Sequence, residues 1–193
     1  MSVNAKARRV KLLLLDVDGV LTDGTVTIHA DGTESKTFGI RDGIGMVWAA
    51  RAGLTVGLLS ARQSATTPHR AAQLGITIVQ QGVSNKLEGY ERILASVGVT
   101  DADVAYMGDD IVDLAVLGRA GLSAAPGDAV AEVRARVDWV SRAAAGRGAV
   151  RELIELILRA QGQWRAIVAA SGVAPAPGGP ALPSGARRGA RRR

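Results

Sequence analysis

The chain of 193 residues has no cysteine, two histidines and only 3% aromatic residues. The absence of cysteine excludes disulfides and thiolate metal sites, and it fits a reducing compartment. His29 and His69 lie far apart in the sequence, and neither belongs to a metal-ligand pattern. Because 47% of the residues are nevertheless hydrophobic, we expect a globular body whose core consists of Ala, Val, Leu and Ile.

Long apolar runs are also absent. The strongest run, 10–15, is too short to span a membrane, and no small-residue cleavage site of the kind found in signal peptides follows it. These absences predict a soluble cytoplasmic protein without a membrane partner.

Basic residues are concentrated at one end of the chain. The formal net charge is +6, and five of these charges come from Arg187, Arg188, Arg191, Arg192 and Arg193. The remainder is 6 − 5 = +1, so a surface for nucleic acid would have to lie in the tail, and we do not expect nucleic acid to be a partner of the fold. Residues 171–193, rich in Ala, Pro, Gly and Arg, are predicted to be disordered, and residues 1–9 to be a loose basic leader.

Strand-like and helix-like segments alternate between these ends, which predicts one α/β domain over residues 10–163 with a doubly wound, mostly parallel sheet. The predicted strands are 10–15, 55–59, 76–79, 104–107, 122–125 and 138–140. The predicted helices are 45–52, 65–74, 86–97, 111–117, 129–135 and 148–161. Residues 24–38 interrupt this order with a hairpin signal, two strand-like segments around the turn Ala30-Asp31-Gly32.

The first strand carries the most informative motif, VKLLLLDVDGVLTDG at 10–24. A buried parallel strand here brings Asp16 and Asp18 to its carboxyl end, where open α/β sheets bind ligands. Two carboxylates so close together need a divalent cation, a shared proton or a cationic substrate. The simpler alternative is an Asp-Gly turn, and an EF-hand is excluded because Gly19 is at the fourth position of the loop instead of the sixth.

Further polar residues follow the later strands: Ser60, Lys86, Asp109, Asp110 and Asp113. Each has an ordinary explanation as a helix cap, a solvated lysine or a carboxylate at a helix N-terminus. Together, at one edge of the sheet, they favour phosphoryl transfer, in which a carboxylate nucleophile attacks phosphorus while cations and donors surround its oxygens. A site of carboxylates without His or Cys selects Mg²⁺.

The segment 16–24, the strand that ends at Ser60, Lys86 and the segment 108–113 resemble the four motifs of the haloacid-dehalogenase-like phosphatases. These phosphatases have a Rossmann-like (Rossmannoid) fold. The resemblance implies that Asp16 is the nucleophile and that Asp18 protonates the leaving oxygen and then activates water. It implies phosphate binding by Ser60 and Lys86. It assigns Mg²⁺ to Asp16, the Asp18 carbonyl and Asp109, with Asp110 and Asp113 supporting the site.

The spacing of the motifs leaves no room for a cap domain, because only the hairpin and one helix fit between Asp18 and Ser60, and only one helix and one strand between Ser60 and Lys86. A capless site is open to water. The hairpin flap 24–38 has unpaired edges, and we expect hairpins from several subunits to pair and cover the sites.

A narrower resemblance is to the 3-deoxy-D-manno-octulosonate 8-phosphate phosphatases, a capless tetrameric family, through segments 16–24, 38–45, 58–62, 105–110 and 146–153. It implies a phosphoric monoester hydrolase, a homotetramer that dephosphorylates a sugar-acid phosphate in lipopolysaccharide precursor synthesis. The implied substrate-binding residues are Asp18, Gly39, Ile40, Arg41, Asp42, Gly43, Arg62, Arg70 and Lys86. Forked arginine donors suit a ligand with a carboxylate and a phosphate. The less favoured alternative for Arg70 is a solvated helix residue, and Asp42 can cap the helix 45–52.

Two positions depart from the family pattern: Ala61 replaces an expected glycine, and segment 143–146 has one glycine where a pair is usual. Three alternatives stay open from the sequence. The substrate could be an acylneuraminate 9-phosphate, it could be another small sugar phosphate, or the chain could be a phosphate-binding module without turnover. A receiver domain is disfavoured because its phosphorylated aspartate lies on the third strand.

Overall fold

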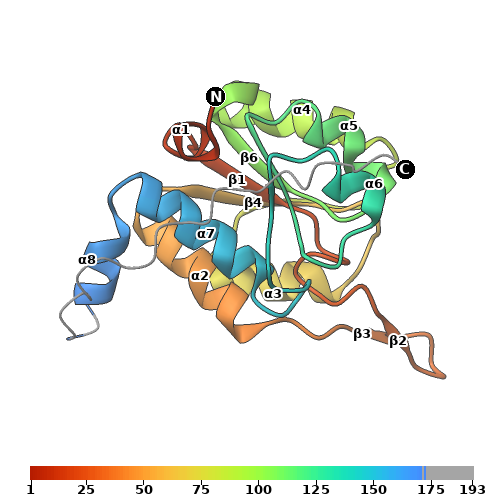
Figure 1. Ribbon diagram of the computed structural model, residues 1–193. Coiled ribbons are helices and arrows are strands. Elements are labelled where there is room, and N and C mark those ends of the chain that lie inside the picture. Colours follow the sequence, from red (N-terminus) through yellow and green to blue (C-terminus); the bar gives the residue numbers. More distant parts are fainter. Residues whose placement is uncertain (171, 173–193) are drawn as a thin grey trace, which may run out of the picture.

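The computed structural model describes residues 1–170 and 172, and its centre is a six-stranded parallel sheet (Figure 1). The strands are β1 (Leu12–Leu15), β4 (Thr55–Leu59), β5 (Ile78–Gln80), β6 (Val104–Met107), β7 (Leu122–Ala125) and β8 (Trp139–Val140). Their spatial order is β5-β4-β1-β6-β7-β8. The predicted doubly wound parallel sheet is therefore confirmed.

Helices cover both faces of the sheet (Figure 1). One core cluster joins the sheet to α2 (Ile40–Arg51), α3 (Thr66–Leu74) and α7 (Ala149–Ala160). The other joins it to α4 (Lys86–Val97), α5 (Leu114–Leu117) and α6 (Ala131–Arg134). In β1, Leu13 and Leu15 belong to the first cluster and Leu12 and Leu14 to the second. The uninterrupted leucine run is explained by this burial on both faces.

The order of the strands reverses between β1 and β6. The chain runs from β1 through β4 to β5 on one side, and then from β6 through β7 to β8 on the other. Sheets of this kind bind ligands at the carboxyl ends of the strands, at the point where the strand order reverses. Asp16 directly follows β1, and Asp109 follows β6, so both aspartates lie at this point.

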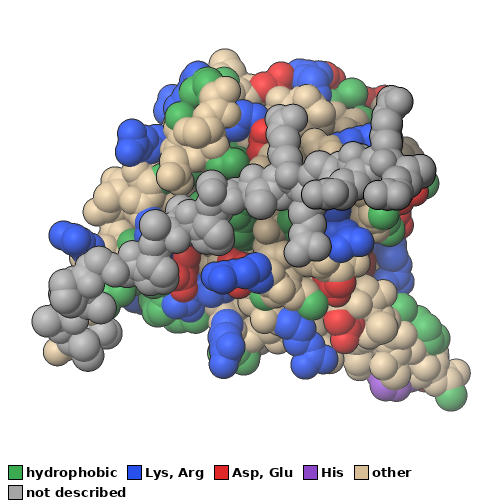
Figure 2. All heavy atoms as spheres, viewed as in Figure 1, with side chains coloured by type: hydrophobic (Ala, Val, Ile, Leu, Met, Phe, Trp, Pro, Cys, Tyr) green, Lys and Arg blue, Asp and Glu red, His purple; other side chains and the backbone are tan. Residues whose placement is uncertain are grey.

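The predicted hairpin is present, with short strands β2 (Thr27–Ile28) and β3 (Glu34–Ser35) in antiparallel pairing. It extends away from the body of the molecule at the lower right of Figures 1 and 2. Only this hairpin, α2 and β4 lie between the first strand motif and Ser60, so the fold is capless as predicted.

Residues 1–9 are not a loose leader, and that prediction is wrong. They contain α1 (Val3–Ala7), whose first turn is capped by the Ser2 hydroxyl accepting from the Ala5 amide. The Ala7 side chain is fully buried among the core residues beside α7, and Lys6 forms an ion pair of 2.6 Å with Asp138. The buried Ala7, the ion pair of Lys6 and the packing of Val3 against the core together attach this segment to the body.

Several boundaries also differ from the prediction. Helix α2 begins at Ile40, five residues earlier than expected, so Asp42 lies in its first turn and does not cap it. A further helix, α8 (Trp164–Ala169), follows α7, and two 3₁₀ turns, η1 (Asp101–Asp103) and η2 (Ile111–Asp113), flank β6. The tail prediction for 171–193 falls outside the described residues, apart from Gly172.

In the described part of the chain, no helix has the length and apolar character needed to cross a membrane. The face seen in Figure 2 carries Lys and Arg in separate groups among Asp and Glu, without one continuous basic surface. This distribution agrees with the near-neutral charge of the body.

Candidate active site

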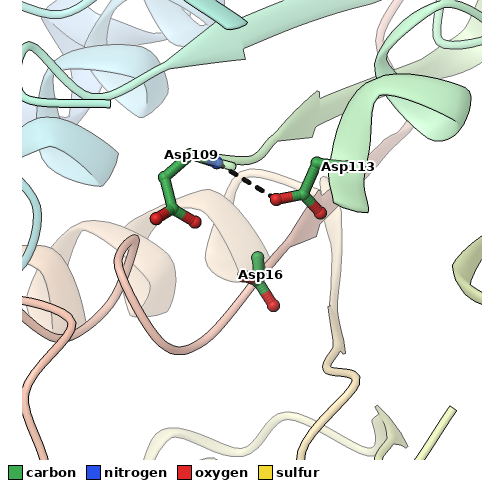
Figure 3. Close-up of side chains that lie close together, drawn as sticks. All are labelled: Asp16, Asp109 and Asp113. Carbon is green, nitrogen blue, oxygen red and sulfur yellow. Dashed lines mark hydrogen bonds between the residues drawn. The ribbon is translucent and has the colours of Figure 1, made fainter. Parts of the chain in front are cut away.

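Three carboxylates meet at the carboxyl ends of β1 and β6 (Figure 3). One carboxylate oxygen each from Asp16, Asp109 and Asp113 lies within 4.8 Å of the other two. Asp16 is supplied by the end of β1 and Asp109 by the loop after β6, while Asp113 ends the 3₁₀ turn that follows. The parallel pairing of β1 and β6, with Leu15 opposite Met107, places these groups side by side.

The cluster carries strong electrostatic repulsion. Burial, with the nearby Asp113 carboxylate, raises the pKa of Asp16 to about 6, although the Lys86 ammonium opposes this effect. Burial, together with Asp16 and Asp113, raises the pKa of Asp109 to about 8. Carboxylates in this state bind a cation at the expense of protons, because a cation removes both the repulsion and the cost of the buried charge.

Gly19 explains how Asp109 reaches the cluster. Its φ of +84° is a conformation that favours glycine, and a Cβ on this residue would lie 2.1 Å from Oδ2 of Asp109. The Asp109 carboxylate therefore packs directly on the backbone of the loop after Asp16. The Asp-Gly pair at 18–19 is more than a turn signal: it makes room for the second carboxylate.

Asp113 is held by four donors and is fully buried. Its Oδ1 accepts from Lys86 Nζ at 2.6 Å and from the Tyr106 hydroxyl at 2.5 Å. Its Oδ2 accepts from the amides of Asp109 at 3.1 Å and Asp110 at 3.4 Å. Because its lone pairs are used in this way, Asp113 supports the loop and Lys86, and it is not expected to coordinate a metal directly.

Lys86 links the cluster to α4. It is the first residue of that helix, whose N-cap is Asn85, and its side chain is 4% exposed. Its ammonium lies 2.9 Å from Asp16 Oδ1 as well as 2.6 Å from Asp113. The two carboxylates raise the pKa of Lys86 in spite of its burial, so this residue stays charged and can also attract phosphoryl oxygens.

The donor set fits Mg²⁺. It consists of carboxylate oxygens without His or Cys, and within the described residues the Asp109 carboxylate accepts no hydrogen bond. Asp16 and Asp109 are the side chains that would hold the ion. The predicted contribution of the Asp18 carbonyl stays a prediction. Asp110 is oriented differently, since its carboxylate caps the 3₁₀ turn by accepting from the Ile111 amide at 2.7 Å.

Ser60 lies where it was predicted, one residue after β4 and almost fully buried. Since Leu15 of β1 pairs with Leu58 of β4, the ends of these strands coincide, and Ser60 belongs to the same edge as Asp16. Its amide donates to the Gln80 carbonyl of β5, which fixes the backbone here. Its role in phosphate binding stays a prediction.

Asp18 has partners of its own, and one of them was missed. Lys36, whose side chain is fully buried, approaches its two oxygens at 2.7 and 2.9 Å, and Arg62 lies 3.8 Å away. Glu34 bonds to Arg62 at 2.9 Å and to the Ser64 hydroxyl. Glu34 and Lys36 belong to the predicted hairpin flap 24–38, and in the structure they face the site from its base.

The residues of segment 39–43, which was predicted to bind substrate, lie in different surroundings in the structure. Ile40 and Arg41 are exposed, and Gly43 leaves room for the Arg70 guanidinium, which lies 2.4 Å from where its Cβ would be. Gly39 faces another loop: a Cβ there would lie 2.6 Å from the Gly146 carbonyl oxygen. Arg70 also lies over the Phe38 ring at 5.9 Å, so it is not a freely solvated residue.

The structure does not bring the Asp42 carboxylate to the cluster. The side chain is buried, and its oxygens accept from the Gly148 amide at 3.0 Å and the Arg151 amide at 2.8 Å. Asp42 therefore caps α7 and joins this helix to α2. A substrate contact through this carboxylate would require these bonds to break, so its predicted binding role is the least supported of the set.

The two departures from the family pattern are compatible with the backbone. Within the described residues no residue other than glycine has a positive φ, so Ala61 is unstrained. In segment 143–146 the glycine is retained at position 146, where φ is +63°. A Cβ at this position would lie 2.9 Å from the Thr22 backbone, so this is the position of the segment that requires glycine. Ala145 before it is buried without needing this conformation.

Comparison with known proteins agrees with this geometry. Residues 58–154 match the family described as haloacid dehalogenase-like hydrolase. The chain is 44% identical over 161 residues to the 3-deoxy-D-manno-octulosonate 8-phosphate phosphatase of Escherichia coli (strain B / BL21-DE3), covering 83% of this chain and 86% of that protein.

Solved structures show the same similarity. The phosphatase of this name from Yersinia pestis is 39% identical with a TM-score of 0.82, covering 83% of this chain and 87% of that one. The one from Moraxella catarrhalis, solved in complex with a magnesium ion, a phosphate ion and a KDO molecule, is 35% identical with a TM-score of 0.86, covering 88% and 97%. The chain thus belongs to the haloacid dehalogenase-like hydrolases, in the family of the 3-deoxy-D-manno-octulosonate 8-phosphate phosphatases.

Proposed function

We propose that this protein is a Mg²⁺-dependent phosphatase that converts 3-deoxy-D-manno-octulosonate 8-phosphate to the free sugar acid and phosphate. The observation that carries the proposal is the contact of Lys86 with Asp16 inside a buried carboxylate cluster. Such a cluster has a nucleophile, a cation for the phosphoryl oxygens and a place for a divalent ion. The complex of the Moraxella catarrhalis relative with magnesium, phosphate and the sugar acid supports the choice of ligands.

The reaction has two halves. In the first, an Asp16 oxygen attacks phosphorus while the ester P–O bond breaks, and Asp18 gives a proton to the departing sugar oxygen. In the second, Asp18 accepts a proton from water, which attacks phosphorus and breaks its bond to Asp16. Inorganic phosphate leaves and the Asp16 carboxylate is restored.

Electrostatics set the roles of the neighbouring residues. Lys86, held by Asp113 at 2.6 Å, keeps positive charge beside the attacking oxygen throughout. Arg62 and Lys36, which contact the Asp18 carboxyl group, fix its orientation. When bound, Mg²⁺ supplies further positive charge against the carboxylates and the phosphoryl oxygens.

Substrate selection is assigned to the surface between the hairpin and α3. Arg62 and Arg70 are the cations with forked geometry in this region, which suits the carboxylate of a sugar acid. Gly43, packed against Arg70, lies beside them. An acylneuraminate 9-phosphate offers the same two anionic groups and is the close alternative.

We further propose a homotetramer in the cytoplasm, acting in lipopolysaccharide precursor synthesis. The exposed hairpin supports self-association, since Ile28 on β2 is 62% exposed and no other described strand pairs with the outer edges of β2 and β3. Light scattering of the intact protein, compared with a variant whose turn 29–33 is shortened to two residues, tests the assembly.

The function is tested by measuring phosphate release from both sugar-acid phosphates, with Mg²⁺ and with EDTA. We expect Mg²⁺-dependent turnover with preference for the octulosonate, and a loss of at least about a thousandfold in Asp16→Asn. Glu88→Gln, on the exposed side of α4, is the control and should keep full activity. Full activity of Asp16→Asn would refute the nucleophile, and preference for the acylneuraminate would select the alternative substrate.

The non-enzymatic alternative, a phosphate-binding module, is separated by a simpler assay. Hydrolysis of p-nitrophenyl phosphate requires only the cluster and no sugar contacts. An inert wild-type protein that still binds phosphate would support the binding module and exclude the phosphatase.

A further inference from the structure

The chain has two tyrosines, Tyr90 and Tyr106, and both are fully buried. Each donates its hydroxyl to an aspartate, Tyr90 to Asp101 at 3.0 Å and Tyr106 to Asp113 at 2.5 Å. Asp101 lies in the turn before β6, whereas Asp113 lies beyond its carboxyl end. The two tyrosines therefore make the same kind of contact at opposite ends of one strand.

We propose that Tyr106 is a positioning residue for phosphoryl transfer: by sharing the charge of Asp113, it leaves the Lys86 ammonium in contact with Asp16. The proposal rests on the proposed function for its kinetic consequence, but not for its geometry. Tyr106 does not reach the reacting atoms, because its hydroxyl is used by Asp113.

Competition between two carboxylates for one ammonium is the physical basis. Lys86 Nζ lies 2.6 Å from Asp113 and 2.9 Å from Asp16. The oxygen of Asp113 that it contacts, Oδ1, also accepts from the Tyr106 hydroxyl. Without the hydroxyl, that oxygen has Lys86 as its one side-chain donor, and its full charge draws the ammonium away from Asp16.

The other oxygen of Asp113 cannot take up this change. Oδ2 already accepts from the backbone amides of Asp109 and Asp110, which fixes the orientation of the carboxylate. Asp113 thus cannot rotate to relieve the loss without releasing the loop that carries Asp109. The hydroxyl of Tyr106 is the remaining group that moderates the pull on Lys86.

Tyr106 is suited to a constant donor role. Burial and the nearby carboxylates raise its pKa well above the ordinary value, so the phenol keeps its proton throughout the working range. It occupies the middle of β6, which is paired on both sides by β1 and β7, so its ring cannot swing out of the core. The position is rigid as well as protonated.

The test compares Tyr106→Phe with Tyr90→Phe in the full chain. Phenylalanine keeps the ring that fills the core, and each variant loses one tyrosine–aspartate hydrogen bond, so both measure the structural part of the change. Turnover of p-nitrophenyl phosphate and of the octulosonate phosphate is measured well below the melting temperature of each protein. Binding of orthovanadate, which adopts a geometry like that of the transition state, is measured by calorimetry with Mg²⁺ present.

We expect Tyr106→Phe to lower kcat roughly tenfold with KM changed by less than about twofold, and to weaken vanadate binding by a similar factor of about ten. Tyr90→Phe should stay within about twofold of the wild type in all three quantities. Unchanged kcat and vanadate affinity in Tyr106→Phe, or equal losses in both variants, would overturn the proposal. Because vanadate binding needs no turnover, a wild type that binds vanadate without hydrolysing esters would refute the proposed function and leave Tyr106 testable.

Discussion

Two regions of this molecule bury carboxylates, and they do so in opposite ways. At the junction of α2 and α7, Asp42 accepts two backbone hydrogen bonds, from Gly148 and Arg151. At the carboxyl edge of the sheet, Asp16 and Asp109 face each other, and the Asp109 carboxylate accepts no hydrogen bond from the described residues. The first arrangement supplies a buried acid with two donors, and the second leaves the Asp109 carboxylate without a donor in the described part of the chain, although Lys86 contacts Asp16.

This difference separates structure from function. A buried acid with its donors in place joins two helices that are far apart in the sequence, and nothing further is needed there. Buried acids that repel each other cost stability unless a cation joins them. The hydrogen-bonded Asp42 therefore belongs to the scaffold of this fold, whereas Asp109, whose carboxylate accepts no hydrogen bond from the described residues, belongs to the site that we propose binds metal.

The largest effect on stability is expected from replacing Asp42, the buried acid whose hydrogen bonds are satisfied. Asp42→Asn keeps the size of the side chain but turns one acceptor into a donor that faces a backbone N–H. We expect a loss of about 2–4 kcal/mol in the free energy of unfolding, because a buried amide is left without its partner. Urea unfolding monitored by circular dichroism measures it.

Glu152→Gln is the matched control. Its Oε2 also accepts two hydrogen bonds, from the Ser141 hydroxyl at 2.8 Å and the Arg142 amide at 2.9 Å, but in a more exposed setting at the same helix end. A loss of about 1 kcal/mol is expected. Equal losses in the two variants would show that burial does not distinguish Asp42.

Replacing Asp109, which lacks such hydrogen bonds, should change the free energy of unfolding in the opposite direction. Asp109→Asn removes an acid that the metal-free folded state holds beside Asp16 only by keeping it protonated, so in EDTA at pH 7 the variant should be more stable than the wild type by about 1–2 kcal/mol. It should also lose most of the stabilisation that Mg²⁺ gives the wild type. Thermal unfolding with EDTA and with Mg²⁺ measures both effects, and a variant less stable than the wild type in EDTA would contradict the assignment of Asp109.

Much of the fold could be predicted from the sequence because its strands are buried on both faces. The strands 104–107 and 122–125 were predicted at their observed bounds, since short apolar runs between turn signals have few other uses. The convergence of Asp16 and Asp109 followed from the same logic, because parallel strands end at one edge. Burial and strand direction are local properties that one sequence reveals.

Contacts between distant segments were beyond this reasoning. Asp42 was predicted to bind substrate, with capping of the helix 45–52 as a further possibility, but its donors lie more than one hundred residues away, a pairing that no local pattern encodes. Lys36 had a usable signal: it is two residues from Glu34, so on an extended strand both face the same side. That side turned out to be the site and not the solvent.

The pH dependence of stability gives the finest test of the comparison. In the metal-free protein the pKa of Asp109 is raised from 3.8 to about 8, so between these values the folded state holds a proton that the unfolded state has released. The free energy of unfolding in EDTA therefore falls as pH rises toward 8. We expect a fall of about 1 kcal/mol between pH 6 and 8.5, which is less than full linkage would give, because solvent reaches part of this side chain and screens its charge. Added Mg²⁺ competes with that proton and should raise the melting temperature more at pH 8.5 than at pH 6. Asp109→Asn should flatten this difference, and a wild type whose Mg²⁺-induced shift is the same at both pH values would show that Asp109 is already ionised without metal.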